Sequence, residues 1–202
     1  MTQLTNLAST TSDRIQLPFS FDVAKMQTEI QLLNLNDFIY YDALPLRAPA
    51  HMVDPSLPLP PPADDFADGS WTDWLDTSML KASPYLMSVV DTFRQHSKVT
   101  LVRLLRLAPG AVVKEHTDPT LGLQITKSVI RLTIPILIND AVEFFLNDIP
   151  VPMKPGECWY LRLTDPHRIN NTGTTERINM TIDLVPNEWV RSMIMDSQEN
   201  PI

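Results

Sequence analysis

Residues 177–184 read RINMTIDL, a strict alternation of polar and aliphatic side chains. Successive side chains of a strand point to opposite faces, so the stretch predicts a strand with one aliphatic face, made of Ile178, Met180, Ile182 and Leu184. The opposite face carries Arg177, Asn179, Thr181 and Asp183. Residues 130–138 (IRLTIPILI) repeat the pattern, with an aliphatic face and a mixed face that includes Arg131, Thr133 and Pro135.

The mixed faces have two interpretations. On an isolated sheet they would face water. In a barrel they would point inward, and the two guanidinium groups of Arg131 and Arg177 would enter a cavity. An unpaired buried charge costs several kcal/mol, so an anionic partner such as a dicarboxylate is then expected. Pro135 removes a donor from the strand ladder, which predicts an edge position or a bulge.

Further strands are expected before and between these two stretches, and the strand that contains 130–138 is expected to begin at 125. Their ranges are 99–107, 111–116, 125–138, 143–146, 157–163 and 168–170. Turn signals separate them, including Ala108-Pro109-Gly110, Asn147-Asp148 and Lys154-Pro155-Gly156. Many short strands at close spacing are typical of an antiparallel sandwich or barrel.

We expect the whole chain, residues 1–202, to form a single domain with four parts. Residues 1–20 form a loose N-terminus, and 21–98 form helical support with a proline-rich loop. The barrel core is 99–185, and 186–202 are a C-terminal helix and tail. Helices are expected after the caps Asp22, Ser83 and Asn187, and a strand at 38–47. The proline-dense segment 48–70 is a long loop, either a lid or a plain exposed loop.

Composition limits the class of protein. The 202 residues carry a net charge of −8, which argues against nucleic-acid and anionic-membrane partners. One cysteine excludes an intrachain disulfide, and neither a membrane span nor a signal peptide is visible. We therefore expect a cytoplasmic protein. The oligomeric state is left open, with a homodimer as the alternative to a monomer.

Three side chains form a candidate metal site. His116 and Asp118 are two residues apart, so an extended segment places both on one side. His167 follows 49 residues after Asp118, a gap that allows several strands to bring it back. Two histidines and one carboxylate are the facial triad of Fe(II) oxygenases, which leaves three positions for a 2-oxo acid and O2. Arg177, expected on the strand next to His167, could hold a distal carboxylate.

Other polar and aromatic residues have simpler interpretations. His51 and His96 are expected at the surface, and Cys158 in the core. Trp159 and Tyr160 are expected in the core or the barrel wall. Glu115 and Asp165 are either partners of the metal ligands or solvated neighbours, and Asp183 could pair with an arginine.

Several segments resemble the aspartyl/asparaginyl β-hydroxylase-like family, nearest to its bacterial L-proline cis-hydroxylase branch. They are Arg103–Gly110, Lys114–Asp118, Ile130–Pro135, Pro155–Leu161 and Asp165–Arg177. The resemblance covers roughly residues 80–185. It implies a double-stranded β-helix, a jelly-roll or cupin-like barrel that is mainly β, with N-terminal helices packed on it. It also implies Fe(II), 2-oxoglutarate and O2.

The resemblance assigns roles to individual residues. His116, Asp118 and His167 look like the catalytic iron ligands, and Arg177 like the clamp for 2-oxoglutarate. Arg131 matches a second arginine that contacts this co-substrate. The animal enzymes carry Gly in place of Asp118 and His in place of Thr133, so Thr133 implies a co-substrate pocket that differs in detail.

We therefore expect a dioxygenase that hydroxylates an unactivated C–H bond of an amino acid, free or within a peptide or small natural product. Succinate and CO2 would be the other products. Two alternatives stay open at this stage. One is a non-catalytic cupin-like module that binds metal or ligand, and the other is a cupin isomerase or metal hydrolase.

Overall fold

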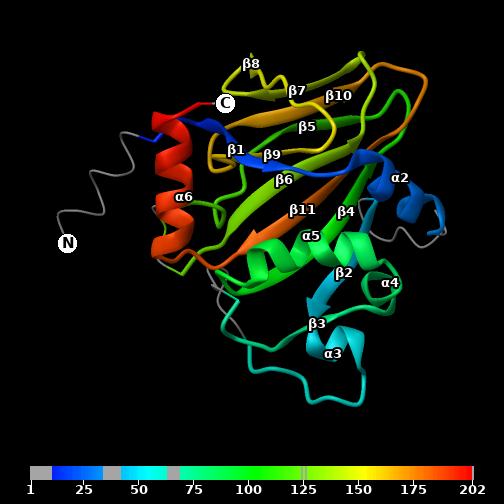
Figure 1. Ribbon diagram of the computed structural model, residues 1–202, viewed down its shortest axis with the longest axis vertical. Coiled ribbons are helices and arrows are strands. Elements are labelled where there is room, and N and C mark those ends of the chain that lie inside the picture. Colours follow the sequence, from blue (N-terminus) through cyan, green and yellow to red (C-terminus); the bar gives the residue numbers. More distant parts are fainter. Residues whose placement is uncertain (1–10, 34–41, 63–68, 124, 126, 202) are drawn as a thin grey trace.

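Two antiparallel sheets face each other in the computed structural model of the protein, which describes residues 11–33, 42–62, 69–123, 125 and 127–201 (Figure 1). The seven-stranded sheet has the order β1 (Arg14–Ser20), β9 (Glu157–Leu161), β6 (Ile130–Leu137), β11 (Arg177–Leu184), β4 (Val99–Leu107), β2 (Ala43–Pro49) and β3 (Trp74–Asp76). The four-stranded sheet has the order β5 (Val112–His116), β10 (His167–Asn171), β7 (Val142–Leu146) and β8 (Ile149–Pro150). This arrangement is the jelly-roll barrel that the sequence predicts.

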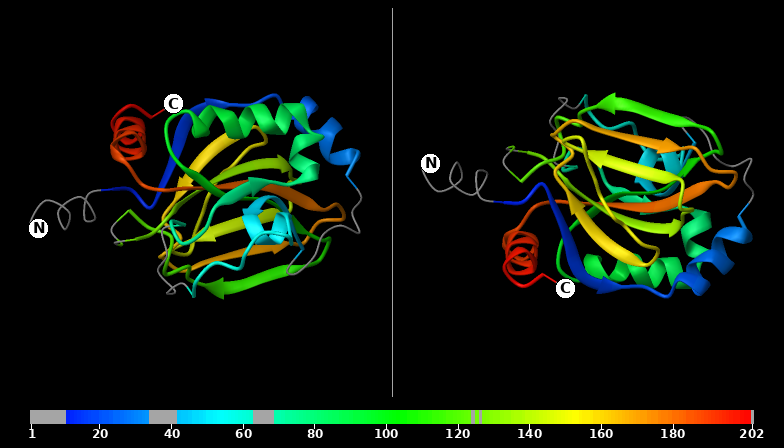
Figure 2. Two further views of the ribbon diagram at one scale, coloured as in Figure 1. Left: turned by 90° about the horizontal axis from the view of Figure 1, so that it is seen from below. Right: turned by 90° about the horizontal axis from the view of Figure 1, so that it is seen from above.

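Three helices cover the outer face of the seven-stranded sheet, the side turned away from the four-stranded sheet (Figure 2). They are α2 (Val23–Gln31), α5 (Pro84–Arg94) and α6 (Glu188–Glu199). Asp22 and Asn187 cap α2 and α6 as expected, each accepting a backbone N–H. Ser83 makes no such bond at the start of α5. There the Glu29 carboxylate accepts the N–H groups of Tyr85 and Leu86 instead, at 2.7 and 2.9 Å.

Strand β11 lies in the middle of the seven-stranded sheet, and all eight of its residues are buried. Its aliphatic residues pack with the three helices in the larger core. Its polar residues share a face with Thr133 of β6 and, through it, with Trp159 of β9. Trp159 belongs to a second apolar cluster, which includes Phe144 and Leu146 of the four-stranded sheet. The polar face of β11 therefore points into the barrel, as the barrel interpretation predicts.

The expectation of a loose N-terminus over residues 1–20 is wrong for 14–20. These residues form β1, which pairs with β9 and buries Ile15 and Leu17. The strand forms because Ile15 and Leu17 pack into the apolar core between the seven-stranded sheet and the helices, while its backbone pairs with β9 as the edge strand of that sheet. Residues 1–10 lie outside the described part of the chain.

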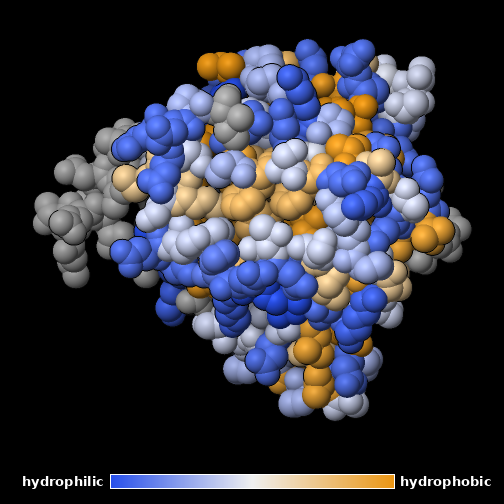
Figure 3. All heavy atoms as spheres, in the orientation of Figure 1, coloured by the Kyte–Doolittle hydropathy of each residue, from blue (hydrophilic) through white to orange (hydrophobic). Residues whose placement is uncertain are grey.

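The expected strand at 38–47 and the expected loop at 48–70 are both shifted. Strand β2 spans Ala43–Pro49, and a short helix, α3 (Ala50–Val53), follows it. Residues 38–41 and 63–68 lie outside the described part, and the role of the loop as a lid stays a prediction. Exposed apolar side chains lie in and after α3, among them Met52 and Leu59. Figure 3 shows hydrophobic side chains at its lower end, where Figure 1 places α3.

Several smaller expectations can also be compared with the structure. The strand expected at 125–138 begins only at Ile130. Pro135 lies in an interior strand, so the edge alternative is wrong. The bulge is confirmed, since the pairing of β6 with β11 shifts next to Pro135. A four-residue helix, α4 (Ser78–Lys81), was not expected. Among the described residues, no helix combines the length and apolarity needed to cross a membrane.

Candidate metal centre

Two histidines face each other across neighbouring strands of the four-stranded sheet. His116 is the last residue of β5 and His167 is the first of β10, and the pairing register places them directly opposite. Their ring centroids are 4.2 Å apart. His116 is exposed, whereas His167 is buried and stacks on Phe144. The antiparallel pairing thus brings together residues 51 positions apart.

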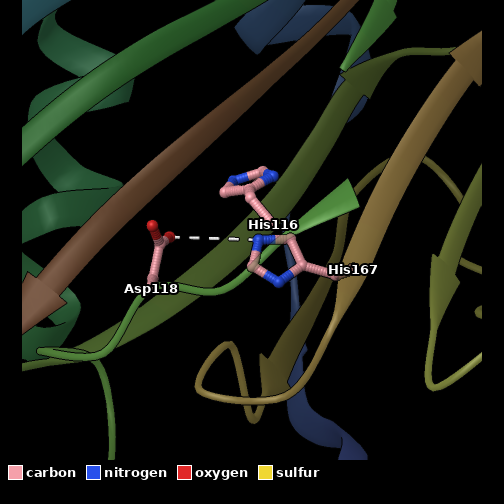
Figure 4. A group of neighbouring side chains, drawn as sticks. All are labelled: His116, Asp118 and His167. Atoms are coloured by element: carbon pink, nitrogen blue, oxygen red, sulfur yellow. Dashed lines mark ion pairs between the residues drawn. The ribbon is translucent and has the colours of Figure 1, made fainter. Parts of the chain in front are cut away.

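Asp118 completes this group from the segment that follows β5. Its backbone N–H donates to the Leu163 carbonyl at 2.8 Å, which ties it to the chain just before His167. The possible ligand atoms of His116, Asp118 and His167 all lie within 4.8 Å of one another. Figure 4 shows the Asp118 carboxylate turned toward the His167 ring, and the Asp118 Oδ2 to His167 Nε2 distance is 4.0 Å. The structure therefore brings together the three side chains that the sequence predicts as metal ligands.

Both imidazoles use the same nitrogen, Nδ1, to contact a backbone carbonyl, which leaves Nε2 as the possible metal ligand. Nδ1 of His116 lies 2.8 Å from the Lys114 carbonyl, and Nδ1 of His167 lies 2.9 Å from the Asp165 carbonyl. Because a carbonyl only accepts, Nδ1 is the nitrogen that carries the proton in the neutral form of each ring, and Nε2 is then the nitrogen with a lone pair for a metal. Burial lowers the pKa of His167, which favours the neutral ring that a metal needs. The donor set of two imidazoles and one carboxylate fits Fe(II).

Arg177 begins β11 and is only 3% exposed. Burial lowers the pKa of its guanidinium to about 10, and no carboxylate of the described residues forms an ion pair with it. Next to it on the same face, Asn179 is also buried, and its side-chain oxygen has no hydrogen-bond partner. A buried guanidinium without a counter-ion fits an anionic ligand in the barrel.

The expectation that Arg177 lies on the strand next to His167 is wrong. Strand β10 pairs with β5 and β7, and β11 pairs with β4 and β6, so the chain crosses between the sheets after Asn171. Arg177 therefore faces the barrel interior from the opposite sheet.

Arg131 and Thr133 lie on the interior face of β6, where their contacts differ. Thr133 is buried opposite Thr181. Arg131 makes a two-bond ion pair with Asp183, at 2.7 and 2.8 Å, and reaches Asp118 Oδ2 at 3.4 Å. The sequence offered Asp183 as a partner for an arginine without saying which one. A contact of either residue with a co-substrate stays a prediction.

The carboxylates that flank the histidines have separate partners. Glu115 and Arg168 form a partly exposed pair at 3.1 Å. The side chain of Asp165 binds Arg162 and Asn147, while its carbonyl accepts from His167. Asp165 therefore holds the turn that carries the buried histidine.

One basic residue was not singled out in the sequence. Arg103 of β4 lies opposite Thr181 in the register, and its Nε is buried without a hydrogen-bond partner. Burial and the neighbouring Arg131 lower the pKa of Arg103. Its position on the interior face follows from the same alternation that identified Arg177.

The two facing sheets define a double-stranded β-helix protein. The group formed by His116, Asp118 and His167, where β5 ends and β10 begins, is its candidate metal site. Residues 70–186 match the family model described as Aspartyl/Asparaginyl beta-hydroxylase. The match covers more than half of the chain, and the chain belongs to this family.

Two known proteins show the extent of the similarity. The chain is 26% identical to L-proline cis-4-hydroxylase of Rhizobium meliloti (strain 1021) over 125 residues, which are 62% of this chain and 44% of that protein. The chain thus spans less than half the length of this relative. A crystal structure of a 2OG-Fe(II) oxygenase family oxidoreductase from Burkholderia pseudomallei has a TM-score of 0.54 at 11% identity, over 90% of this chain and 89% of that one. That likeness concerns the fold alone.

Proposed function

We propose that this chain is an Fe(II)- and 2-oxoglutarate-dependent dioxygenase that hydroxylates an unactivated C–H bond of an amino acid, free or within a peptide or small natural product. The observation that carries the proposal is the group formed by His116, Asp118 and His167, whose possible ligand atoms lie within 4.8 Å of one another. The same barrel buries the guanidinium of Arg177, which forms no ion pair with any carboxylate of the described residues. Membership of the hydroxylase family supports the same reaction class.

The protein's first task is to hold the metal and leave room beside it. His116 and His167 would contribute Nε2 and Asp118 a carboxylate oxygen, and three coordination positions stay open on the ion. The carbonyls that accept from the two Nδ1–H groups fix the ring orientations. Iron, 2-oxoglutarate and O2 together supply the oxidising power that inserts one oxygen atom into the C–H bond, with succinate and CO2 as co-products.

Arg177 would bind the distal carboxylate of 2-oxoglutarate. A guanidinium donates two parallel hydrogen bonds to a carboxylate, and a lysine ammonium does not match that geometry. The carboxylate would also neutralise a charge that the described residues leave unpaired. The hydroxyl of Thr133 and the amide of Asn179 lie on the same interior face and are available for further hydrogen bonds.

Apolar side chains on the interior would also limit the access of water. Phe144, Leu146, Trp159 and Leu161 line the barrel between the two sheets, next to the buried ring of His167. A dry environment strengthens the hydrogen bonds to the anionic co-substrate. The name of the R. meliloti relative supports an amino acid as the first substrate to test.

The test is anaerobic reconstitution with Fe(II) and 2-oxoglutarate, followed by admission of O2 and measurement of succinate across a panel of free L-amino acids and short peptides. We expect succinate formation that depends on O2. We also expect a product that is heavier than the substrate by one oxygen atom, about 16 mass units. In Arg177→Ala, iron binding should persist while 2-oxoglutarate turnover collapses.

Two results would favour the other functions. Turnover without O2 or 2-oxoglutarate would indicate an isomerase or hydrolase that uses the same ligands. Metal binding without turnover of any kind, including uncoupled 2-oxoglutarate decarboxylation, would indicate a binding module. A normal KM for 2-oxoglutarate in Arg177→Ala would remove Arg177 from its proposed role.

A further inference from the structure

Arg131 and Asp183 form a buried ion pair next to Asp118. The Nε and Nη2 groups of Arg131 donate to the two oxygens of Asp183, at 2.7 and 2.8 Å. The side chain of Asp183 is 5% exposed and that of Arg131 is 14% exposed. Two parallel charge-assisted bonds of this kind fix the plane of the guanidinium. Arg131 is therefore held in one orientation by β11, the strand that also carries Arg177.

The remaining arm of Arg131 points at Asp118. Its Nη1 lies 3.4 Å from Oδ2 of Asp118. The same oxygen lies 4.0 Å from Nε2 of His167. A carboxylate oxygen has two lone pairs, so Oδ2 can accept from Arg131 and still offer a lone pair toward the histidines. The contact therefore limits the rotation of a carboxylate that is otherwise 31% exposed.

The charge of Arg131 would oppose a cation unless it were compensated. A guanidinium this close to a metal ligand repels the ion and draws electron density from the carboxylate. Asp183 supplies the compensating charge through a two-bond contact, at a buried position where screening by solvent is weak. The pair Asp183–Arg131 can thus orient Asp118 while adding no net charge.

We propose that Asp183 and Arg131 are positioning residues for the metal site: Arg131 orients the Asp118 carboxylate, and Asp183 cancels the charge that would otherwise compete with the ion. This inference rests on the proposed metal site. It assigns Arg131 to the metal ligand, whereas the family resemblance assigns it to the co-substrate.

The two roles of the pair make a specific prediction about a double substitution. In Asp183→Asn, the charge of Arg131 is uncompensated, so metal affinity should fall by roughly 10- to 100-fold, the usual range for partners of metal ligands. Adding Arg131→Gln removes that charge, so the double variant should recover part of the loss. If the pair only supported the fold, the second substitution would leave the loss unchanged or deepen it.

The experiment is a titration of the apo protein with Mn(II) alone, followed by the EPR signal of the free ion. Wild type, Asp183→Asn, Arg131→Gln and the double variant are compared after far-UV circular dichroism has checked the fold. Asp76→Asn is the matched control, because Asp76 is a half-buried carboxylate that pairs with Arg47 and Arg94 at the far edge of the seven-stranded sheet. It should lose stability and keep wild-type Mn(II) affinity.

Arg131→Lys gives a second readout in case Asp183→Asn does not fold. Lysine keeps the charge but cannot bridge two carboxylates as a planar fork, so Mn(II) binding should weaken. Wild-type affinity in Asp183→Asn or in Arg131→Lys would overturn the inference and leave the metal site intact, as would a double variant that binds no better than Asp183→Asn. Failure of the wild-type protein to bind Mn(II) would overturn the metal site itself, and the positioning role with it.

Discussion

Replacing Arg177 by methionine should make the ligand-free protein more stable and abolish its response to 2-oxoglutarate. Burial lowers the pKa of this guanidinium well below its usual range, to about 10. One pKa unit corresponds to about 1.4 kcal/mol, so keeping the folded side chain charged costs about 3 kcal/mol. The cost is fully present at neutral pH, because both the folded and the unfolded chain are protonated there, and it is relieved only as the pH rises through about 10.

Methionine is of similar length but uncharged, and it fills less volume. Some packing is lost, so the expected net gain in the free energy of unfolding is about 1 to 3 kcal/mol. The assay is urea denaturation at pH 7 with neither metal nor co-substrate. Arg106→Met is the control on the neighbouring strand β4, since Arg106 already pairs with Glu176 at 2.6 Å and should give no gain.

The same two variants are then heated with Mn(II), with and without 2-oxoglutarate. Wild type and Arg106→Met should show an increase in Tm that depends on 2-oxoglutarate, because a ligand that binds only the folded state stabilises it. Arg177→Met should not. A loss of stability in ligand-free Arg177→Met would mean that the guanidinium is already satisfied inside the protein. An unchanged 2-oxoglutarate response would mean that the co-substrate binds elsewhere.

Three further predictions concern other parts of the chain. His116→Ala and His167→Ala should each abolish Fe(II)-dependent succinate release, because each removes a ligand; full activity in either would exclude that residue from the metal site. Glu29→Gln should lower the free energy of unfolding by about 1 kcal/mol, since a charged acceptor of two N–H groups at the start of α5 becomes neutral; denaturation indistinguishable from wild type would show that this contact contributes nothing. Gly156→Ala should cost more than Gly110→Ala in the same assay. Both glycines have positive φ, but a Cβ at Gly156 would lie 2.6 Å from a backbone carbonyl oxygen, whereas at Gly110 it meets nothing within 4 Å. Equal losses would contradict the steric argument.

The strands of the barrel could be predicted because each has its own signal. Alternation identified β6 and β11 and also their two faces, since a strand buried on both sides still separates aliphatic from polar residues. Strand β1 was missed, although Ile15 and Leu17 alternate there, because its existence depends on pairing with β9, which lies far along the chain and places Cys158 opposite Leu17. Strand β3 and helices α3 and α4 have three or four residues each and are too short for periodicity.

Part of the candidate site could likewise be predicted from the sequence, and part could not. The chemistry of His116, Asp118, His167 and Arg177 could be read from residue type and order, because few other groups in the chain could do the same work. The pairing of Arg131 with Asp183 could not, since it depends on the register between β6 and β11, which places these two residues opposite each other. That register is not visible in either strand alone.

The burial of β11 on both faces restricts how this barrel can change. A deletion or insertion of one residue in β11 would exchange its faces, moving isoleucine and methionine into the barrel interior and charged groups among the helices. Substitutions at alternate positions avoid this, since they alter the face of β11 that points into the barrel and leave the face that packs against the helices unchanged. Variation in ligand preference is therefore expected through replacements on this strand, while changes in its length are confined to the turns at its ends.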